Sequence, residues 1–206
     1  MTQTTKRMIG LGLAGMAAAL LALVAAGCGS DSDPIPTGSA AQPPGTAAAE
    51  SPKKLPAALA ANRAEANQIL EEGTLSAKLE SLRGHPVVVN QWASWCEPCR
   101  AEFPFFQASA EAHAADIAFV GIDMQDDPGA AEAFLAELPV PYPSISDPDA
   151  AQIRSLGGGV VSPTTVFIDE QGEIVAVFQG SYTSVEQLEA DIEQNLLSGP
   201  GSRRAS

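Results

Sequence analysis

The chain has 206 residues, of which 45% are hydrophobic and 17% charged, and its formal net charge at pH 7 is −14. This length suits one domain with additional segments. The acidic balance argues against binding to nucleic acid, which requires clustered Lys and Arg at the phosphates, and against electrostatic adhesion to anionic lipid headgroups.

The N-terminal segment has the pattern of a targeting sequence. Lys6 and Arg7 precede an apolar, uncharged run over residues 8–26, which ends in small residues. A basic start, an apolar run and small residues at its end are typical of a secretory signal peptide. Because the run is almost long enough to span a bilayer, an uncleaved membrane anchor is the alternative. We therefore predict a signal peptide over residues 1–27 and a location outside the cytoplasm for the rest of the protein.

The sequence AAGC, which ends at Cys28, resembles a bacterial lipobox, in which the cysteine is lipidated before cleavage. Lipoboxes usually carry Leu three residues before the cysteine, where this chain has Ala25. The resemblance implies a lipid anchor on Cys28, whereas an incidental cysteine would leave the protein secreted. The segment that follows is rich in Pro, Gly, Ser and Ala and contains no aromatic residue, so residues 28–52 are predicted to form a flexible tether.

Apolar periodicity predicts a domain over residues 53–197 that begins with a helical extension, and a disordered tail over residues 198–206. The predicted helices cover residues 55–70, 74–82, the segment after Cys96, 127–138, 148–156 and 183–196. The predicted strands cover residues 86–92, 116–123, 142–146, 164–169 and, as a hairpin return, 173–179. Helices that alternate with strands predict an α/β fold with a central mixed β-sheet flanked by helices.

Two of the three cysteines form a C-x-x-C unit, Cys96 and Cys99, directly after a predicted strand and at the start of a predicted helix. A helix N-terminus carries unpaired N–H groups and a partial positive charge. A thiolate at Cys96 is stabilised there, which lowers its pKa and makes it the nucleophile. Cys99 follows one turn later on the same face, close enough to resolve a mixed disulfide. The pattern predicts redox chemistry that needs no further cofactor, because the cysteines carry the electrons.

The cysteine pair has two other interpretations, a zinc site and a purely structural disulfide. A zinc site would need two further ligands, but the chain has no second C-x-x-C, and its two histidines, His85 and His113, do not have ligand spacing. We therefore predict no metal site and place both histidines at the surface. A purely structural disulfide would close a loop too short to stabilise the fold appreciably.

The segment WASWCEPCRAEFP resembles the active site of TlpA/ResA-like thiol–disulfide oxidoreductases, the membrane-tethered extracytoplasmic branch of the thioredoxin superfamily. The segments VGIDMQDD and VVSPTTVFIDEQGEIV extend the resemblance over residues 74–197. It implies a thioredoxin-like fold with an αβ insertion, for which residues 124–147 are a natural place. It also implies that Pro163 is a cis-proline facing Cys96, although Ser162-Pro163 taken alone fits an ordinary turn or strand start.

Around the cysteine pair, the resemblance implies substrate contacts from five residues: Trp95, Glu97, Pro98, Ser162 and Pro163. The residues themselves favour packing roles for Trp92 and Trp95, with Trp95 able to shield Cys96. Glu97 and Arg100 are interpreted as solvated residues that modulate the charge near the site.

Asn90 occupies the strand position where cytosolic thioredoxins carry a buried Asp. Glu102 is the candidate substitute, since it follows Cys99 by three residues on the same helical stripe, and ResA-like proteins carry Glu at the matching position. A partly desolvated carboxylate beside two thiols would have a raised pKa and could transfer protons. The alternative is a solvated Glu on the helix surface.

The resemblance implies reduction of disulfides in exported proteins, with apocytochrome c as a candidate client because haem attachment needs a reduced C-x-x-C-H. The electrons would come from a membrane thiol carrier of the CcdA/DsbD type, and the protein is expected to be a monomer. A disulfide-forming oxidase has the same fold and motif, because potentials in this superfamily span about −270 to −120 mV. A thiol peroxidase and a binding module with an inert disulfide are further alternatives.

Overall fold

A computed structural model describes residues 54–159 and 161–198. The predicted signal peptide, Cys28, the tether and residues 199–206 of the predicted tail lie outside the described residues. Within residues 54–159 and 161–198, no helix is long and apolar enough to cross a membrane.

The core of the domain is a six-stranded mixed sheet in the order β1-β4-β3-β2-β5-β6. Its strands are β1 (Ile69–Leu70), β2 (Val87–Trp92), β3 (Ala118–Met124), β4 (Ser144–Asp147), β5 (Thr164–Ile168) and β6 (Ile174–Gln179). β1, β4, β3 and β2 pair in parallel, whereas β5 pairs antiparallel with β2 and β6 antiparallel with β5. Every residue of β2, β3 and β5 is buried, as expected for strands covered on both faces. The predicted mixed sheet is therefore confirmed.

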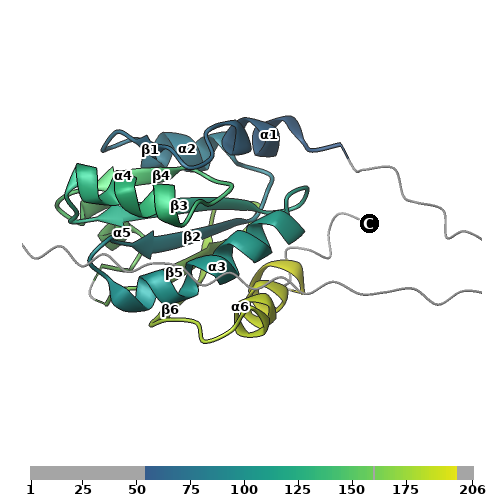
Figure 1. Cartoon of the computed structure of the whole chain (residues 1–206). Helices are drawn as coiled ribbons and strands as arrows, with labels where there is room; N and C mark the ends of the chain where they lie inside the picture. Colours follow the sequence, from purple (N-terminus) through teal and green to yellow (C-terminus); the bar gives the residue numbers. More distant parts are fainter. Residues whose placement is uncertain (1–53, 160, 199–206) are drawn as a thin grey trace, which may run out of the picture. The chain divides into compact units, whose positions relative to one another are not determined.

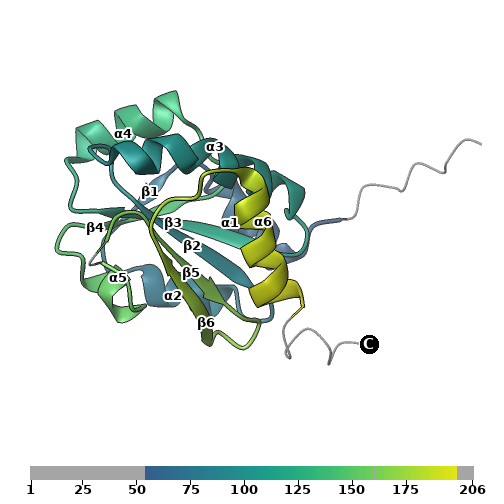
Figure 2. The same cartoon turned by 90° about the horizontal axis from the view of Figure 1, so that it is seen from below.

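Helices cover both faces of this sheet (Figures 1 and 2). They are α1 (Ala57–Ala64), α2 (Leu75–Ser81), α3 (Glu97–Ala112), α4 (Pro128–Glu137), α5 (Ala151–Ser155) and α6 (Val185–Ile192), which continues into a π-helical turn at Glu193–Leu197. The apolar side chains of α3, α4 and α6 form one core cluster with the sheet, and those of α1, α2 and α5 contribute to a second. The segment predicted as an αβ insertion, residues 124–147, holds α4 and β4.

The helix predicted over residues 55–70 is wrong in its second half. α1 ends at Ala64, Asn67 takes a left-handed backbone with φ 62°, and Ile69–Leu70 is the edge strand β1. Asn tolerates that conformation, and its side chain has tertiary partners: Nδ2 donates to the Leu135 carbonyl at 3.1 Å, and Oδ1 accepts from the Val140 N–H at 3.1 Å. Local propensity favours a longer helix here, but these long-range bonds and the pairing of β1 with β4 override it.

Candidate active site

Cys96 and Cys99 are joined by a disulfide at the point where β2 gives way to α3. Cys96 is the N-cap of α3, and its sulfur accepts a hydrogen bond from the Cys99 N–H at 3.3 Å. Pro98 lies in the first helical turn, where its missing N–H costs no helical bond. Cys96 is 3% exposed and Cys99 is 0% exposed. Both cysteines are therefore buried, and Cys96 is the one of the pair that keeps a small exposed area.

Trp92 anchors the end of β2 in the core. Its ring stacks on Phe134 of α4 with centroids 4.9 Å apart and meets the edge of Phe103 of α3 at 5.4 Å. Its Nε1 donates to the Ser144 hydroxyl at 3.0 Å, and a Cβ added at Gly121 would lie 2.9 Å from that nitrogen. A glycine is therefore required on the neighbouring strand for the indole to sit this close. The interpretation of Trp92 as a packing residue is confirmed.

Trp95, by contrast, is not a core residue. It is 57% exposed, and its Nε1 donates to the Gln125 carbonyl at 3.1 Å. The interpretation of Trp95 as a packing residue is thus wrong, because the indole directly before Cys96 lies on the surface. An exposed aromatic residue beside a reactive sulfur fits the alternative of a substrate contact.

Next to β2 in the sheet, β5 begins after a cis peptide bond between Ser162 and Pro163, and its first residue Thr164 pairs with Gln91 near the end of β2. The cis conformation that the resemblance implied is therefore confirmed. Pro163 is buried, and its carbonyl accepts from the Gly180 N–H at 3.0 Å. The Ser162 hydroxyl accepts a hydrogen bond from the Gln91 side chain of β2. This bond ties the cis-proline loop to the strand that precedes the cysteines, a link that the sequence analysis missed.

Glu102 is fully buried, at 0% exposure, so its interpretation as a solvated surface residue is wrong. Its Oε2 accepts from the Tyr182 N–H at 2.9 Å, and its Oε1 has no hydrogen-bond partner among the described residues. Burial raises its pKa to about 8, although the bond from Tyr182 opposes the shift. A carboxyl with this pKa keeps its proton at neutral pH and titrates close to the range of a thiol.

Asn90 is buried on the face of the sheet that α3 covers. It shares this face of β2 with Val88 and Trp92, which both belong to the core cluster of α3, and its register partner on β5 is Thr165. An amide neither gains nor loses a proton at physiological pH. The arrangement therefore leaves Glu102 as the titrating group that α3 contributes next to Cys99.

The charged residues near the start of α3 differ from one another. Glu97 is exposed, as predicted, and so is the neighbouring Pro98. Arg100 is not simply solvated, because its Nη1 lies 2.9 Å from Glu137 Oε1 and its guanidinium sits 4.8 Å from the centre of the Phe134 ring. The Arg100 guanidinium, four residues after Cys96 in the sequence, is thus held by two side chains of α4.

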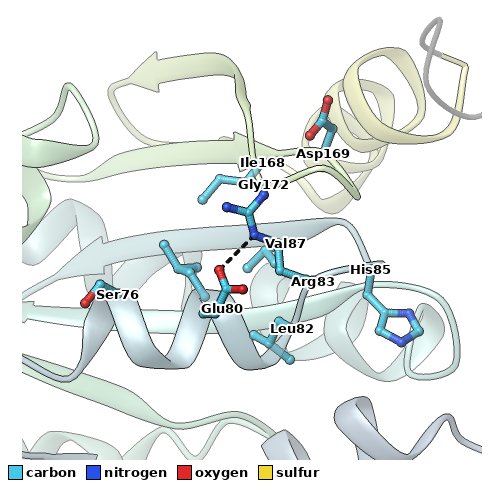
Figure 3. Close-up of a pocket in the computed structure, with 10 residues that line it drawn as sticks. Ser76, Glu80, Leu82, Arg83, His85, Val87, Ile168, Asp169 and Gly172 are labelled. Carbon is cyan, nitrogen blue, oxygen red and sulfur yellow. Dashed lines mark hydrogen bonds and ion pairs between the residues drawn. The ribbon is translucent and has the colours of Figure 1, made fainter.

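Neither histidine is freely solvated. His113 pairs with Glu189 at 2.7 Å and is partly buried. His85 lines a cavity of about 260 Å³ between α2 and the β5–β6 turn, where Arg83 pairs with Glu80 at 3.1 Å (Figure 3). Val87, the first residue of β2, also lines this cavity, whereas the cysteines follow the last residue of that strand. The cavity is therefore separate from the redox pair.

The family model described as Redoxin matches residues 33–192, which is most of the chain. This chain belongs to the Redoxin family. Its similarity to ResA-type proteins confirms the resemblance found in the sequence. It is 33% identical to the thiol-disulfide oxidoreductase ResA of Oceanobacillus iheyensis over 56% of this chain and 61% of that protein. It is 39% identical to the thiol:disulfide interchange protein DsbE of Pseudomonas aeruginosa over 59% of this chain and 67% of that protein.

Among solved structures, this Redoxin domain is similar to a putative thiol:disulfide interchange protein DsbE from Chlorobium tepidum. The TM-score is 0.53 at 29% identity, and the match covers 57% of this chain and 84% of that one. The predicted thioredoxin-like fold is therefore confirmed. The alignment to ResA spans less than two thirds of that protein's length, so the comparison describes the domain that carries the cysteines. That domain is a thiol–disulfide oxidoreductase domain.

Proposed function

We propose that the protein is an extracytoplasmic, membrane-tethered thiol–disulfide oxidoreductase that reduces disulfides in exported proteins. The observation that carries this proposal is the position of the pair: Cys96 caps a helix N-terminus and keeps a small exposed area of 3%, whereas Cys99 is fully buried on the stripe of Glu102. Cys96 can attack the disulfide of a protein client, while Cys99 attacks the mixed disulfide in the second step.

The reaction follows from this geometry. The Cys96 thiolate attacks one sulfur of a client disulfide, which breaks the client S–S bond and forms a mixed disulfide. Cys99 then transfers its proton to Glu102 in the fraction of molecules whose Glu102 is ionised, a fraction that grows as the pH approaches 8, and the resulting thiolate attacks the Cys96 sulfur. The client leaves as a dithiol after taking up two protons, and the Cys96/Cys99 dithiol has given it two electrons and become the Cys96–Cys99 disulfide. A membrane thiol carrier of the CcdA/DsbD type restores the dithiol.

The side chains at the surface of the pair suit a polypeptide client. Trp95 and Val161 are 57% and 41% exposed and flank the cysteines and the cis-proline loop, while Ser162 is partly exposed beside them. Glu97 and Pro98 are exposed in the first turn of α3. We include apocytochrome c among the clients, because haem attachment requires its C-x-x-C-H cysteines in reduced form.

The direct test uses a peptide that contains an oxidised C-x-x-C-H segment. The reduced protein is expected to convert the peptide to its dithiol with single-turnover kinetics, and the Cys96→Ser/Cys99→Ser double variant is expected to leave it oxidised. Mass spectrometry after alkylation measures both species. An equal rate for the double variant would refute the proposal, and peroxide consumption without peptide reduction would identify a peroxidase instead.

The tether is proposed from the sequence alone. Replacing Cys28 with alanine is expected to release the protein from the membrane fraction or to leave an unprocessed precursor, because no thiol remains to carry the lipid. Fractionation and mass spectrometry of the mature N-terminus measure this. An unmodified Cys28 in processed protein would contradict the anchor.

A further inference from the structure

An acidic side chain from the β3–α4 loop holds the segment that leads into Cys96. The Asp126 Oδ2 accepts a hydrogen bond from the backbone N–H of Ser94, and its Oδ1 accepts from the Ser94 hydroxyl at 2.7 Å. The neighbouring Asp127 N–H also donates to Oδ1, at 2.8 Å. Both carboxylate oxygens are thus engaged, and a residue two positions before Cys96 is bound through its backbone and its side chain.

The same loop makes a second contact with the residue that precedes Cys96. The Gln125 carbonyl accepts from Trp95 Nε1 at 3.1 Å, and Gln125 takes a left-handed backbone with φ 53°. The Gln125 N–H in turn donates to the Asp147 carbonyl of β4 at 3.1 Å. The loop is thereby anchored on the sheet while it fixes Ser94 and Trp95.

Asp123 determines where the negative charge of this loop lies. It is 4% exposed at the end of β3, where its register partners are Trp92 and Ser146. Burial, the charge of Asp126 and a hydrogen bond with it raise the pKa of Asp123 to about 8. At neutral pH, therefore, Asp123 keeps its proton and does not add a second negative charge beside Asp126.

Other ionisable groups of the surrounding elements do not cancel this charge. They are Glu97, Arg100, Glu102 and Glu111 on α3, Asp127, Glu132 and Glu137 on α4 and its cap, and Asp147 at the end of β4. The only cation among them, Arg100, is paired with Glu137. The Cα atoms of Ser94 and Cys96 are at most about 7 Å apart along the chain. The carboxylate bound to the Ser94 N–H is therefore held on the order of one screening length, roughly 10 Å, from Cys96.

We propose that Asp126 is a positioning residue of the redox site, which fixes the Ser94–Trp95 segment ahead of Cys96 and keeps a negative charge near its sulfur. The charge opposes the helix N-terminus and disfavours the Cys96 thiolate. A couple whose reduced form is less stabilised gives up its electrons more readily. Asp126 thus biases the pair towards reduction of clients, an inference that rests on the proposed function.

The test compares Asp126→Asn with Asp127→Asn. Both variants remove one negative charge, but Asp127 caps α4 through the Ala130 N–H and does not contact Ser94. In glutathione buffer, Asp126→Asn is expected to shift the equilibrium constant of the Cys96–Cys99 pair about tenfold towards the dithiol, or about 30 mV to less negative potential. It should also lower the pKa seen in Cys96 alkylation. Asp127→Asn should change the constant less than twofold.

Positioning has its own readout in amide hydrogen exchange. Asp126→Ala removes the acceptor of the Ser94 N–H, so exchange at Ser94 is expected to accelerate at least tenfold while circular dichroism shows the parent fold. Equal potentials for Asp126→Asn and Asp127→Asn, or unchanged Ser94 exchange in Asp126→Ala, would overturn the proposal. A parent protein that never equilibrates with glutathione would instead refute the proposed function, and Ser94 exchange would still decide the positioning role.

Discussion

The Cys99→Ser variant is expected to accumulate client proteins as mixed disulfides on Cys96, and the Cys96→Ser variant is expected to accumulate none. The reason is the difference in access, since Cys96 is 3% exposed at the helix N-terminus and Cys99 is fully buried. Without Cys99 the first attack still occurs, but no second thiol is present to release the client. Non-reducing electrophoresis with mass spectrometry of the trapped species measures the difference.

Two controls make this result specific. The double variant Cys96→Ser/Cys99→Ser retains Cys28 and shows whether any adduct forms outside the pair. Adding dithiothreitol should release the clients from Cys99→Ser. Equal trapping by the two single variants would contradict the assignment of Cys96 as the attacking thiol.

The Glu102→Gln variant is expected to resolve mixed disulfides at least about tenfold more slowly at neutral pH, within the usual range for loss of a general base. The raised pKa of Glu102, about 8, matches that of an ordinary thiol, so a proton passes between the two groups at little cost. Glutamine can still accept the Tyr182 N–H bond, but it cannot take a proton. Stopped-flow measurement of client release from pH 6 to 9 should show that the variant has lost an ionisation near pH 8.

The same substitution has a defined effect on stability. Because the folded-state pKa of Glu102 is above its ordinary value of 4.5, the folded protein binds a proton that the unfolded chain releases, and the parent loses stability as pH rises from about 4.5 to about 8. Glu102→Gln should therefore gain free energy of unfolding relative to the parent over this window. Urea denaturation at several pH values measures it. Glu111→Gln, an exposed position on the same helix, is the control. Identical pH profiles for parent and Glu102→Gln in both experiments would exclude the proton-handling role.

The features of the fold that follow from local pattern were predictable. The buried runs at β2, β3 and β5 are long enough to be recognised as core strands, and the cysteines follow the first of them directly. The two-residue strand β1 was not predictable, because it exists only through its pairing with β4. A segment rich in Ala carries no local signal for that partner.

The part of the site that depends on the spacing of residues along a single helix was predictable. Cys96, Cys99 and Glu102 lie on one stripe of α3, and i, i+3 spacing is sufficient to bring them together. Burial of Glu102 against the Tyr182 backbone depends on the segment between β6 and α6, 80 positions along the chain, so the sequence alone could not decide whether Glu102 is buried or solvated. The bond between Ser94 and Asp126 joins two loops and was missed as well. The motif VGIDMQDD contained the only available signal, since it places acidic residues at the end of a strand next to β2.

The midpoint potential of the Cys96–Cys99 pair, measured by equilibration with glutathione or dithiothreitol at pH 7, tests the central claim most directly. The Asp126 carboxylate and the exposed Glu97 both disfavour the Cys96 thiolate, while Glu137 engages the neighbouring Arg100. The account therefore predicts a reducing couple, close to the value of about −270 mV found for thioredoxin. A potential near the value of about −120 mV that characterises DsbA would contradict it and identify a disulfide-forming oxidase.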